Sequence, residues 1–375
     1  MNFKQLLKLI LGWRAFLIIF AIGGMFLLPF GDKFPYRESL LVPYGSPIFY
    51  SWAGFDGVHY LTIAEHGYEA QFTQAFFPVY PLLIRWLTLL TGNYLLSGLL
   101  ISHVSLLIAL YFLYLLVRID EKKQVAYQTL LLLLAFPTAF FFGALYSESL
   151  FLMLVVTSLY AIRKGMTKEA IALALFASAT RIIGIFLLPA LLYEKYLSLD
   201  KKITKNNFTH YLPIFLSAAG LLGYMSYLHR VFGDALYFLN AQSAFGAQRS
   251  TQQVILLYQV IFRYMKMFMT VDFTSLLFYT VSLEFITSML FLALLILAYI
   301  KKVRLSYLLF AVPAYLLPTL TGTFSSMPRY VLVLFPGFIV LAKIIPRKWQ
   351  PVVLTISAIL LALNTILFTR GYWVA

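Results

Sequence analysis

Residues 276–300 read LLFYTVSLEFITSMLFLALLILAYI, and Lys301, Lys302 and Arg304 follow almost at once. The run contains a single carboxylate, Glu284. It is longer than the ~17 to 20 apolar residues that are needed to cross a ~30 Å hydrocarbon core. A run of this kind predicts a membrane-spanning helix that ends at a basic cluster facing water.

Similar runs recur along the whole chain. Hydrophobic residues make up 62% of the 375 positions and charged residues 11%, whereas a soluble domain carries roughly 25% charged residues. About ten stretches approach or exceed the ~17 to 20 residues of a span. Because only helices and closed barrels satisfy their backbone in lipid, we expect an all-α polytopic membrane protein. It should form one membrane domain over residues 1–375, with about ten to twelve transmembrane or half-membrane helices.

The net charge of +15 does not indicate a nucleic-acid partner, because the basic residues form short clusters between apolar runs and not one stripe. Clusters of this kind are typical of cytoplasmic loops. The chain has no cysteine, which excludes disulfides and thiolate metal sites. Lys4, Lys8 and Arg14 lead into an apolar run that ends near Phe30. Its length and the lack of a small-residue cleavage pattern favour an uncleaved anchor over a signal peptide.

With a cytoplasmic amino terminus, the charge pattern predicts a first extracytoplasmic loop at 31–93 and a second extracytoplasmic segment at 231–272. The stretch 169–193 is interrupted at Thr180-Arg181. We interpret it as a hairpin of two short helices with Arg181 at its outward tip. The other predicted helices are 94–117, 125–145, 149–162, 211–228, 276–300, 305–320, 330–345 and 352–368. The basic clusters near 118–123, 163–168, 195–205, 301–304 and 347–348 then face the cytoplasm.

The first of these loops is unusually rich in polar and aromatic residues. A short helix from Phe55 would place Asp56, His59 and Tyr60 on one face through their i, i+3 and i+4 spacing. A structural role is equally open at this stage, since Asp is a favoured helix N-cap. Two histidines without further ligands favour hydrogen bonding over a zinc site. Glu65 lies on the same predicted helix, where a solvated position is the alternative.

Several blocks of sequence resemble the second mannosyltransferase family of glycosylphosphatidylinositol-anchor synthesis and its prokaryotic relatives. The first block reads FDGVHYLTIAEHGY at residues 55–68, followed by AFFPVYPLLIR at 75–85. The later blocks are Tyr146-Ser147-Glu148-Ser149-Leu150-Phe151, Thr180-Arg181 with Gly184, Gly233-Asp234 with Ala241-Gln242, and Ser326-Met327-Pro328-Arg329-Tyr330. They occur in the family's order, so the resemblance covers residues from about 52 to 336.

The resemblance implies a membrane glycosyltransferase of the GT-C class. Such an enzyme takes a sugar, which we expect to be mannose, from a polyprenyl-phosphate donor on the extracytoplasmic side and transfers it to a lipid or glycolipid acceptor. Asp56 is then the expected general base of an inverting transfer. We expect no metal or other cofactor, since basic side chains can stabilise the leaving lipid phosphate. The expected substrate-binding residues are His59, Tyr60, Glu65, Arg181, Asp234 and Arg329.

Structural roles remain open for three of these residues. Arg329 can be an arginine that reaches from a helix end to the interface, and Arg181 can hold a broken helix through an interhelical hydrogen bond. Asp234 can cap the helix that follows it. The sequence alone does not decide between these roles and substrate binding.

A transporter of lipids or small solutes is the main alternative of another class. Such a protein is expected to place ionisable groups near the bilayer midplane in broken helices. Apart from Glu284, the predicted spans are almost free of carboxylates, which favours the enzyme. A GT-C enzyme that uses another sugar and a catalytically inactive relative also stay open. The expected location is the cytoplasmic membrane in a prokaryote or the endoplasmic reticulum membrane in a eukaryote.

Overall fold

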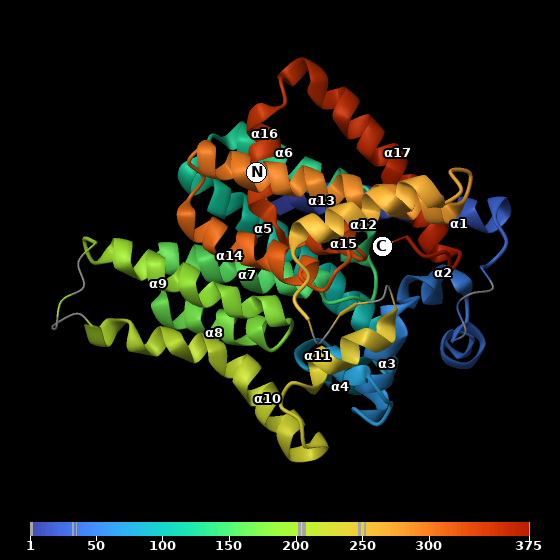
Figure 1. The fold of residues 1–375 in the computed structure, drawn as a ribbon, viewed down its shortest axis with the longest axis horizontal. Helices are drawn as coiled ribbons and strands as arrows, with labels where there is room; N and C mark the ends of the chain where they lie inside the picture. The colour runs from blue at the N-terminus through green and yellow to red at the C-terminus, as the bar shows by residue number, and fades with distance from the viewer. Residues whose placement is uncertain are drawn as a thin grey trace.

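A computed structural model describes residues 3–31, 34, 36–201, 204, 208–246, 249–250 and 253–374. Within these ranges the chain is helical and contains no strand (Figure 1). The helices are α1 (Phe3–Leu27), α2 (Pro47–Tyr50), α3 (Asp56–His66), α4 (Val79–Thr91), α5 (Tyr94–Asp120), α6 (Lys123–Ala135), α7 (Glu148–Arg163), α8 (Thr167–Ser178), α9 (Leu187–Ser198), α10 (Ala219–Phe232), α11 (Tyr237–Asn240), α12 (Leu257–Thr270), α13 (Leu276–Ile300), α14 (Leu305–Thr319), α15 (Met327–Tyr330), α16 (Phe335–Ile344) and α17 (Gln350–Thr369).

Five helical segments of the described chain are long and apolar enough to cross a membrane. They are α1, α5, α13, the segment Phe208–Phe232 that ends in α10, and Arg347–Thr369, which contains α17. The pair Met327–Val333 and Phe335–Ile344 passes the same test when its two parts are taken together, although it is bent by 82°. The prediction of an all-α polytopic membrane protein is therefore confirmed. The number of ten to twelve transmembrane or half-membrane helices stays a prediction.

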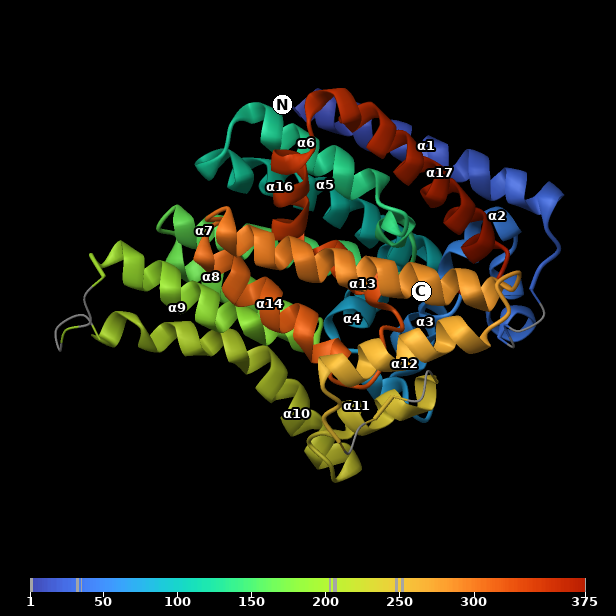
Figure 2. The same ribbon diagram turned by 45° about the horizontal axis from the view of Figure 1, so that its top comes forward.

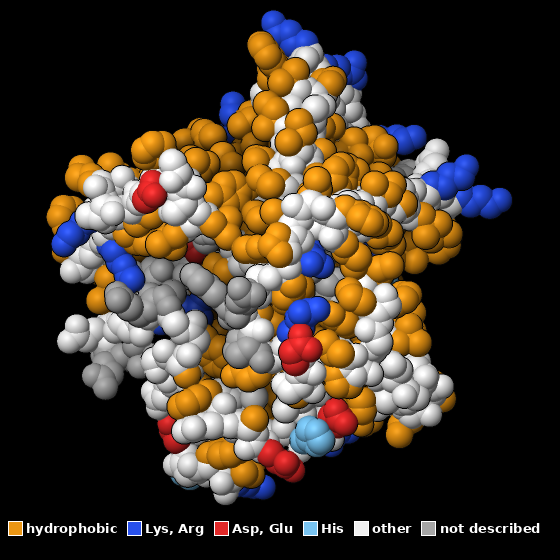
Figure 3. All heavy atoms as spheres, turned by 90° about the vertical axis from the view of Figure 1, so that its right-hand side faces the viewer, with side chains coloured by type: hydrophobic (Ala, Val, Ile, Leu, Met, Phe, Trp, Pro, Cys, Tyr) orange, Lys and Arg blue, Asp and Glu red, His pale blue; other side chains and the backbone are white. Residues whose placement is uncertain are grey.

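The helices pack around one long apolar cluster whose buried members run from Leu6 to Val374. Helix α1 lies beside α17 (Figure 2), although the two are at opposite ends of the sequence. Helix α7 packs against α5 on one side and α8 on another. On the face seen in Figure 3, hydrophobic side chains form large continuous areas of the surface. This surface is what contact with lipid requires, since a water-soluble protein exposes only small apolar patches.

Two predicted helices are interrupted, and a proline lies close to each interruption. The helix predicted at 125–145 ends at Ala135, and a 3₁₀ turn follows at Ala139–Gly143. Because the residue before a proline avoids the helical conformation, Phe136 before Pro137 is extended, with ψ 141°. The helix predicted at 330–345 breaks at Leu334, two residues before Pro336. The prediction of one continuous helix was wrong in both places.

The interrupted stretch at 169–193 forms two short helices, as predicted. Helix α8 ends at Ser178, Arg181 has extended backbone dihedrals, and α9 begins at Leu187. Both helices pack against α7 and lie side by side (Figures 1 and 2). Arg181 therefore lies at the connection between the two, close to the beginning of α7.

The predicted basic clusters meet at one end of the bundle through ion pairs. Arg163 at the end of α7 pairs with Asp120 at the end of α5. The other pairs there are Lys343 with Glu121 at 2.5 Å and Arg304 with Glu194 at 2.7 Å. Lys202 and Lys205, which were predicted to belong to the same side, lie outside the described residues. Helix α7 has 16 residues, so its first residue, Glu148, lies ~24 Å from this end at 1.5 Å per residue.

Candidate active site

A cavity of about 610 Å³ lies at the end of α7 that is remote from the basic clusters. The start of α3, the start of α7, the connection between α8 and α9, the segment 249–250 and α15 contribute its charged side chains. Aromatic and aliphatic side chains from α11, the end of α14 and Trp373 complete its walls. The polar residues of the lining are Tyr36, Asp56, His59, Tyr60, Glu148, Thr180, Arg181, Gln242, Arg249, Thr321, Ser325, Ser326, Arg329 and Tyr330.

Helix α3 is fixed against the turn that precedes α7. The hydroxyl of Tyr146 donates to the carbonyl of Gly54 at 2.9 Å. The hydroxyls of Tyr60 and Ser147 are 3.0 Å apart and share a hydrogen bond. A Cβ atom at Gly57 would lie only 3.3 Å from the nearest side chain and 3.4 Å from a backbone oxygen, so glycine allows the close approach. This packing brings Asp56 near the beginning of α7.

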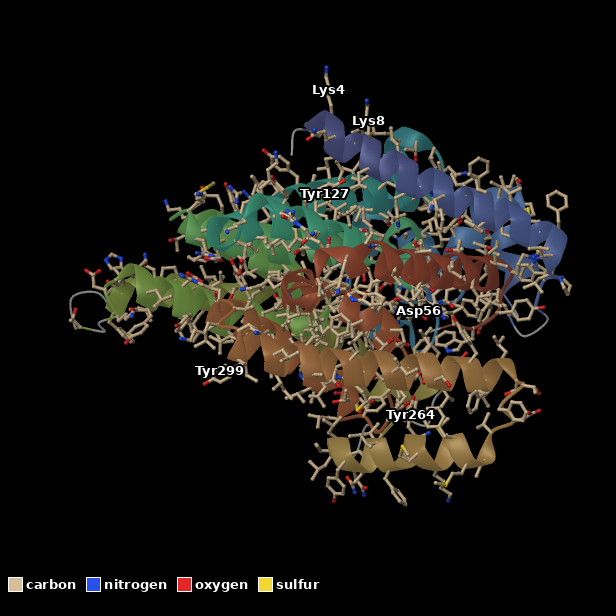
Figure 4. The ribbon with its side chains drawn as sticks, turned by 90° about the horizontal axis from the view of Figure 1, so that it is seen from above. Lys4, Lys8, Asp56, Tyr127, Tyr264 and Tyr299 are labelled. Carbon is tan, nitrogen blue, oxygen red and sulfur yellow. The ribbon has the colours of Figure 1, made fainter. Side chains whose placement is uncertain are left out.

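Asp56 is the first residue of α3, but its side chain does not act as a helix cap. The N-cap residue is Phe55, which has a φ of 55° and makes no side-chain cap bond. This left-handed conformation is strained for a non-glycine residue, and such strain is concentrated at functional sites. One oxygen of the Asp56 carboxylate, Oδ2, accepts a hydrogen bond of 2.5 Å from Nη1 of Arg329. Figure 4 shows Asp56 inside the helix array, in contrast to Lys4 and Lys8, which project from it.

Arg329 is held in the interior by a rigid backbone and by aromatic rings. The residue is 7% exposed. The hydroxyl of Thr138 donates to the carbonyl of Pro328 at 2.5 Å, which ties α15 to the bundle. The Arg329 guanidinium lies 5.3 Å from the ring centre of Tyr146 and 5.2 Å from that of Tyr330. Cation–π contacts at these distances stabilise a desolvated guanidinium, so Arg329 does not reach out to the interface as a snorkelling arginine would.

A second acid–base pair extends this arrangement. Nη1 of Arg181 donates to Oε1 of Glu148 at 2.8 Å, and Nε of Arg329 lies 3.4 Å from the same oxygen. Glu148 is 2% exposed, and its second oxygen has no hydrogen-bond partner within the described chain. Asp56, Arg329, Glu148 and Arg181 thus form a row of alternating charge. The predicted interhelical role of Arg181 is present, and the pair also lines the cavity.

The electrostatics of the site keep Asp56 ionised and His59 neutral at neutral pH. Burial alone would raise the pKa of Asp56, but the charge and hydrogen bond of Arg329 hold it below its ordinary value. Burial lowers the pKa of His59 below 6.5 against the opposing effect of Asp56. Burial, together with the charge of Glu148, raises the pKa of Tyr60. An ionised carboxylate in a largely buried cavity is therefore available to accept a proton.

The structure brings together five of the seven residues predicted for the site. Asp56, His59, Tyr60, Arg181 and Arg329 all line the cavity. The other two lie outside its lining. Glu65 is exposed on α3, 3.8 Å from His66. Asp234 accepts hydrogen bonds from the backbone N–H of Leu236 and from the side chain of Asn240. It stabilises the turn before α11 but is not the cap considered above, since the N-cap of α11 is Leu236.

Two charged residues of the cavity, Glu148 and Arg249, were absent from the predicted set. Glu148 begins an apolar helix, and a carboxylate beside such a run is a signal of function. Arg249 belongs to the predicted second extracytoplasmic segment, 231–272, where a single basic residue in a loop is no signal of a site. Neither position reveals that the two residues face the same cavity. In the part of the chain that the structure describes, no three His, Asp or Glu residues form a group that could hold a metal ion.

Comparison with known proteins finds that part of this chain is similar to one family. Residues 38–217 match the family described as Mannosyltransferase (PIG-V). These residues, just under half of the chain, are similar to that family. The chain is also 29% identical over 165 residues to the human protein "GPI alpha-1,6-mannosyltransferase 2". The alignment covers 41% of this chain and 33% of the human protein. No solved structure matches the chain.

The predicted family resemblance is therefore confirmed, and the matched region contains the larger part of the predicted site. Asp56, His59, Tyr60 and Arg181 lie within residues 38–217, as does Glu148. Arg249 and Arg329 follow that region. They join the site through the fold, since Arg329 pairs with Asp56 across a sequence separation of 273 residues.

Proposed function

We propose that this protein is a membrane glycosyltransferase of the PIG-V family. It transfers mannose from a polyprenyl-phosphate-linked donor to a lipid or glycolipid acceptor. One observation carries the proposal: the cavity holds an ionised carboxylate bonded to a buried guanidinium within a chain of a mannosyltransferase family. The human relative's name specifies transfer of mannose.

The cavity is lined by both ionised and aliphatic side chains, which suits a substrate with a polar head and a lipid tail. Asp56, Glu148 and Arg329 supply ionised groups to the lining, and Ile183 and Leu317 supply aliphatic surface. A sugar phosphate needs hydrogen-bond donors and acceptors, and a polyprenyl chain needs apolar contact. The same cavity offers both, in a protein whose helices are apolar enough to span a membrane.

In the proposed reaction Asp56 acts as the general base. Its carboxylate accepts the proton of an acceptor hydroxyl while the oxygen of that hydroxyl bonds to the anomeric carbon of the donor sugar. The bond between this carbon and the phosphate oxygen breaks, and its electron pair remains on the phosphate. Attack from the face opposite the phosphate inverts the anomeric configuration, as in inverting glycoside hydrolysis. The Arg329 guanidinium stabilises the charge of the departing phosphate.

Because Asp56 is paired with Arg329, binding of the donor also changes the basicity of Asp56. The hydrogen bond of 2.5 Å makes Asp56 a weak base as long as the pair is intact, because Arg329 stabilises its ionised form. A donor phosphate that binds Arg329 competes with Asp56 for the guanidinium. The basicity of Asp56 then rises when the donor is in place.

We assign the cavity to the extracytoplasmic side. The basic clusters lie at the other end of α7 and are joined there by the ion pairs of Arg163, Arg304 and Lys343. Basic residues next to spans favour the cytoplasmic side. A polyprenyl-phosphate sugar on the opposite side would place its phosphate at the level of the cavity.

A transporter remains the alternative of another class, and Glu284 is the residue that would favour it. This carboxylate is 5% exposed within α13, and it accepts a hydrogen bond of 2.5 Å from Tyr264 of α12. Tyr264 lies between the two helices (Figure 4). The bond gives Glu284 a structural partner, which reduces the need for a transport role.

The experiment that separates the two functions uses purified protein in detergent micelles, where no compartment exists for transport. We expect labelled mannose to move from polyprenyl-phosphate-mannose into a lipid extract, and to do so in the presence of a chelator. Donors with glucose and galactose should transfer more slowly. Wild-type protein that is folded but transfers none of these sugars would contradict the proposal, whereas faster transfer of another sugar would correct the donor.

The dependence of this activity on pH follows from the two titrating residues of α3. The pKa of Asp56 lies below its ordinary value of about 3.9 and that of His59 below about 6.5. Because the Asp56 pKa is lowered in the fold, its stabilising pairing is present above that ordinary value and is lost as pH falls through the folded pKa. We therefore expect no acid-side loss of kcat/KM with a midpoint at or above pH 6.5. A midpoint near 7 that disappears in a His59→Gln variant would contradict this assignment.

A further inference from the structure

Arg249 is a charged residue of the cavity that takes no part in the proposed reaction and, within the described chain, forms no ion pair. It belongs to the short described segment 249–250, which precedes α12. The backbone N–H of the next residue, Ser250, donates to the carbonyl of Thr321 at 2.8 Å. This bond fixes the segment to the end of α14, so that Arg249 lines the cavity together with Arg329.

The contacts of the Arg249 guanidinium are long and neutral. Nη1 lies 3.3 Å from Oε1 of Gln242, and Nη2 lies 3.3 Å from Oγ of Ser326. Guanidinium bonds to a carboxylate or a phosphate are shorter, about 2.7 to 2.9 Å. No Asp or Glu within the described chain forms an ion pair with Arg249. This guanidinium is therefore held in place without a direct ion pair, while Asp56 and Glu284 interact with its charge at longer range.

The positive and negative side chains that line the cavity are unequal in number. Asp56 and Glu148 carry two negative charges, and Arg181 and Arg329 carry two positive charges that pair with them. Arg249 adds one further positive charge. An uncompensated charge in a partly buried cavity is costly unless a counter-charge binds. Among the charged residues that line the cavity, the positive charges thus exceed the negative charges by one.

Arg249 is also coupled to Arg329 through Ser326. The Ser326 hydroxyl accepts from Arg249, and the carbonyl of the same residue accepts from the backbone N–H of Arg329 at 3.0 Å. Ser326 has a φ of 66°, which turns the chain into α15. Both residues thus contact Ser326, Arg249 through its guanidinium and Arg329 through its backbone, and both line the cavity. Two guanidinium groups in one cavity suit the several oxygens of a phosphate.

We propose that Arg249 binds the phosphate of the lipid-linked donor and acts with Arg329 to select a substrate that carries a single negative charge. This inference rests on the proposed function and identifies the phosphate contact of the same site. A phosphodiester, as in a polyprenyl-phosphate sugar, carries this charge. Arg249 binds the phosphate in the cavity that it shares with Arg329. Arg329 then releases its hydrogen bond to Asp56 and binds the phosphate instead. A neutral polyprenol lacks the recognised group.

The test measures binding of polyprenyl phosphate without any sugar, so that it does not depend on transfer. Tryptophan fluorescence of the purified protein in micelles is followed during titration with polyprenyl phosphate or polyprenol of the same chain length. The titration is made at pH 5, below the second pKa of a phosphate monoester (about 6), so that the phosphate carries mostly one negative charge, as the donor does. Wild type should bind the phosphate at least about tenfold more tightly than the alcohol, the difference expected of one charge-assisted hydrogen bond. The Arg249→Gln variant should lose this preference, and Arg249→Lys should keep part of it.

The matched control is Arg230→Gln, since Arg230 is exposed at the end of α10 and does not line the cavity. This variant should bind polyprenyl phosphate as wild type does. The inference is overturned if Arg249→Gln, with an unchanged melting temperature, still prefers the phosphate over the alcohol. Tight phosphate binding through Arg249 in a protein that transfers no sugar would instead contradict the proposed transfer and leave the binding site in place.

Discussion

Replacement of Asp56 by Asn lowers the rate of sugar transfer by about 10²- to 10⁴-fold, the usual contribution of a general base. The amide retains the shape of the carboxylate but cannot take up the proton of an acceptor hydroxyl. Its oxygen can still accept a hydrogen bond from Arg329, but it carries no charge, so the bond weakens and donor binding should be retained or become tighter. The measurement is the initial rate at saturating donor, with KM for the donor determined alongside.

The control for Asp56→Asn is Glu69→Gln, which removes a carboxylate from an exposed position after α3. Its rate should stay within about twofold of wild type, because surface substitutions change stability by no more than ±0.5 kcal/mol. A folded Asp56→Asn protein with more than one tenth of the wild-type rate would remove Asp56 from the role of base. Equal losses in both variants would indicate a general effect on the fold.

Replacement of Arg329 by Gln reduces both activity and stability. The variant leaves Asp56 and Glu148 without the guanidinium that lies between them. Loss of one partner of a buried ion pair costs about 3 to 5 kcal/mol. We expect the lower end of that range, because the Asp56 side chain is 19% exposed. The rate should fall about 10²- to 10³-fold, as for loss of one transition-state donor.

A double variant separates the two effects of Arg329. Asp56→Asn combined with Arg329→Gln replaces the ion pair by two amides and should recover part of the lost stability, because no unpaired carboxylate remains at Asp56. Denaturant titration in micelles measures the recovery, with Arg230→Gln as the control. Strictly additive losses in the double variant would show that the two side chains are not coupled. Activity should remain absent in the double variant.

The sequence predicted those parts of the fold and site that depend on local patterns. Uninterrupted apolar runs predicted α5 and α13 almost to the residue, and the break at Thr180-Arg181 predicted the short helices α8 and α9. The spacing of Asp56, His59 and Tyr60 placed them on one face of α3. In each case the signal lies within a single helix or turn, where periodicity and charge determine the structure.

What the sequence could not predict are contacts between distant segments. Glu148 and Arg329 meet Asp56 only because the turn before α7 and the short helix α15 pack beside α3. Arg249 enters the cavity through a backbone bond to the end of α14. The helix ends near Pro137 and Pro336 were missed for another reason, since apolar residues continue through both breaks and hydropathy does not register them.

The most direct test of the account is an NMR measurement of the product that wild-type protein makes from polyprenyl-phosphate-mannose labelled with ¹³C at the anomeric carbon. We predict a new glycosidic signal in the lipid fraction, with an anomeric configuration opposite to that of the donor and with release of polyprenyl phosphate. A product that retains the donor's configuration would contradict Asp56 as the base of a single inverting displacement. The absence of any new linkage from folded protein would contradict the proposed transferase itself.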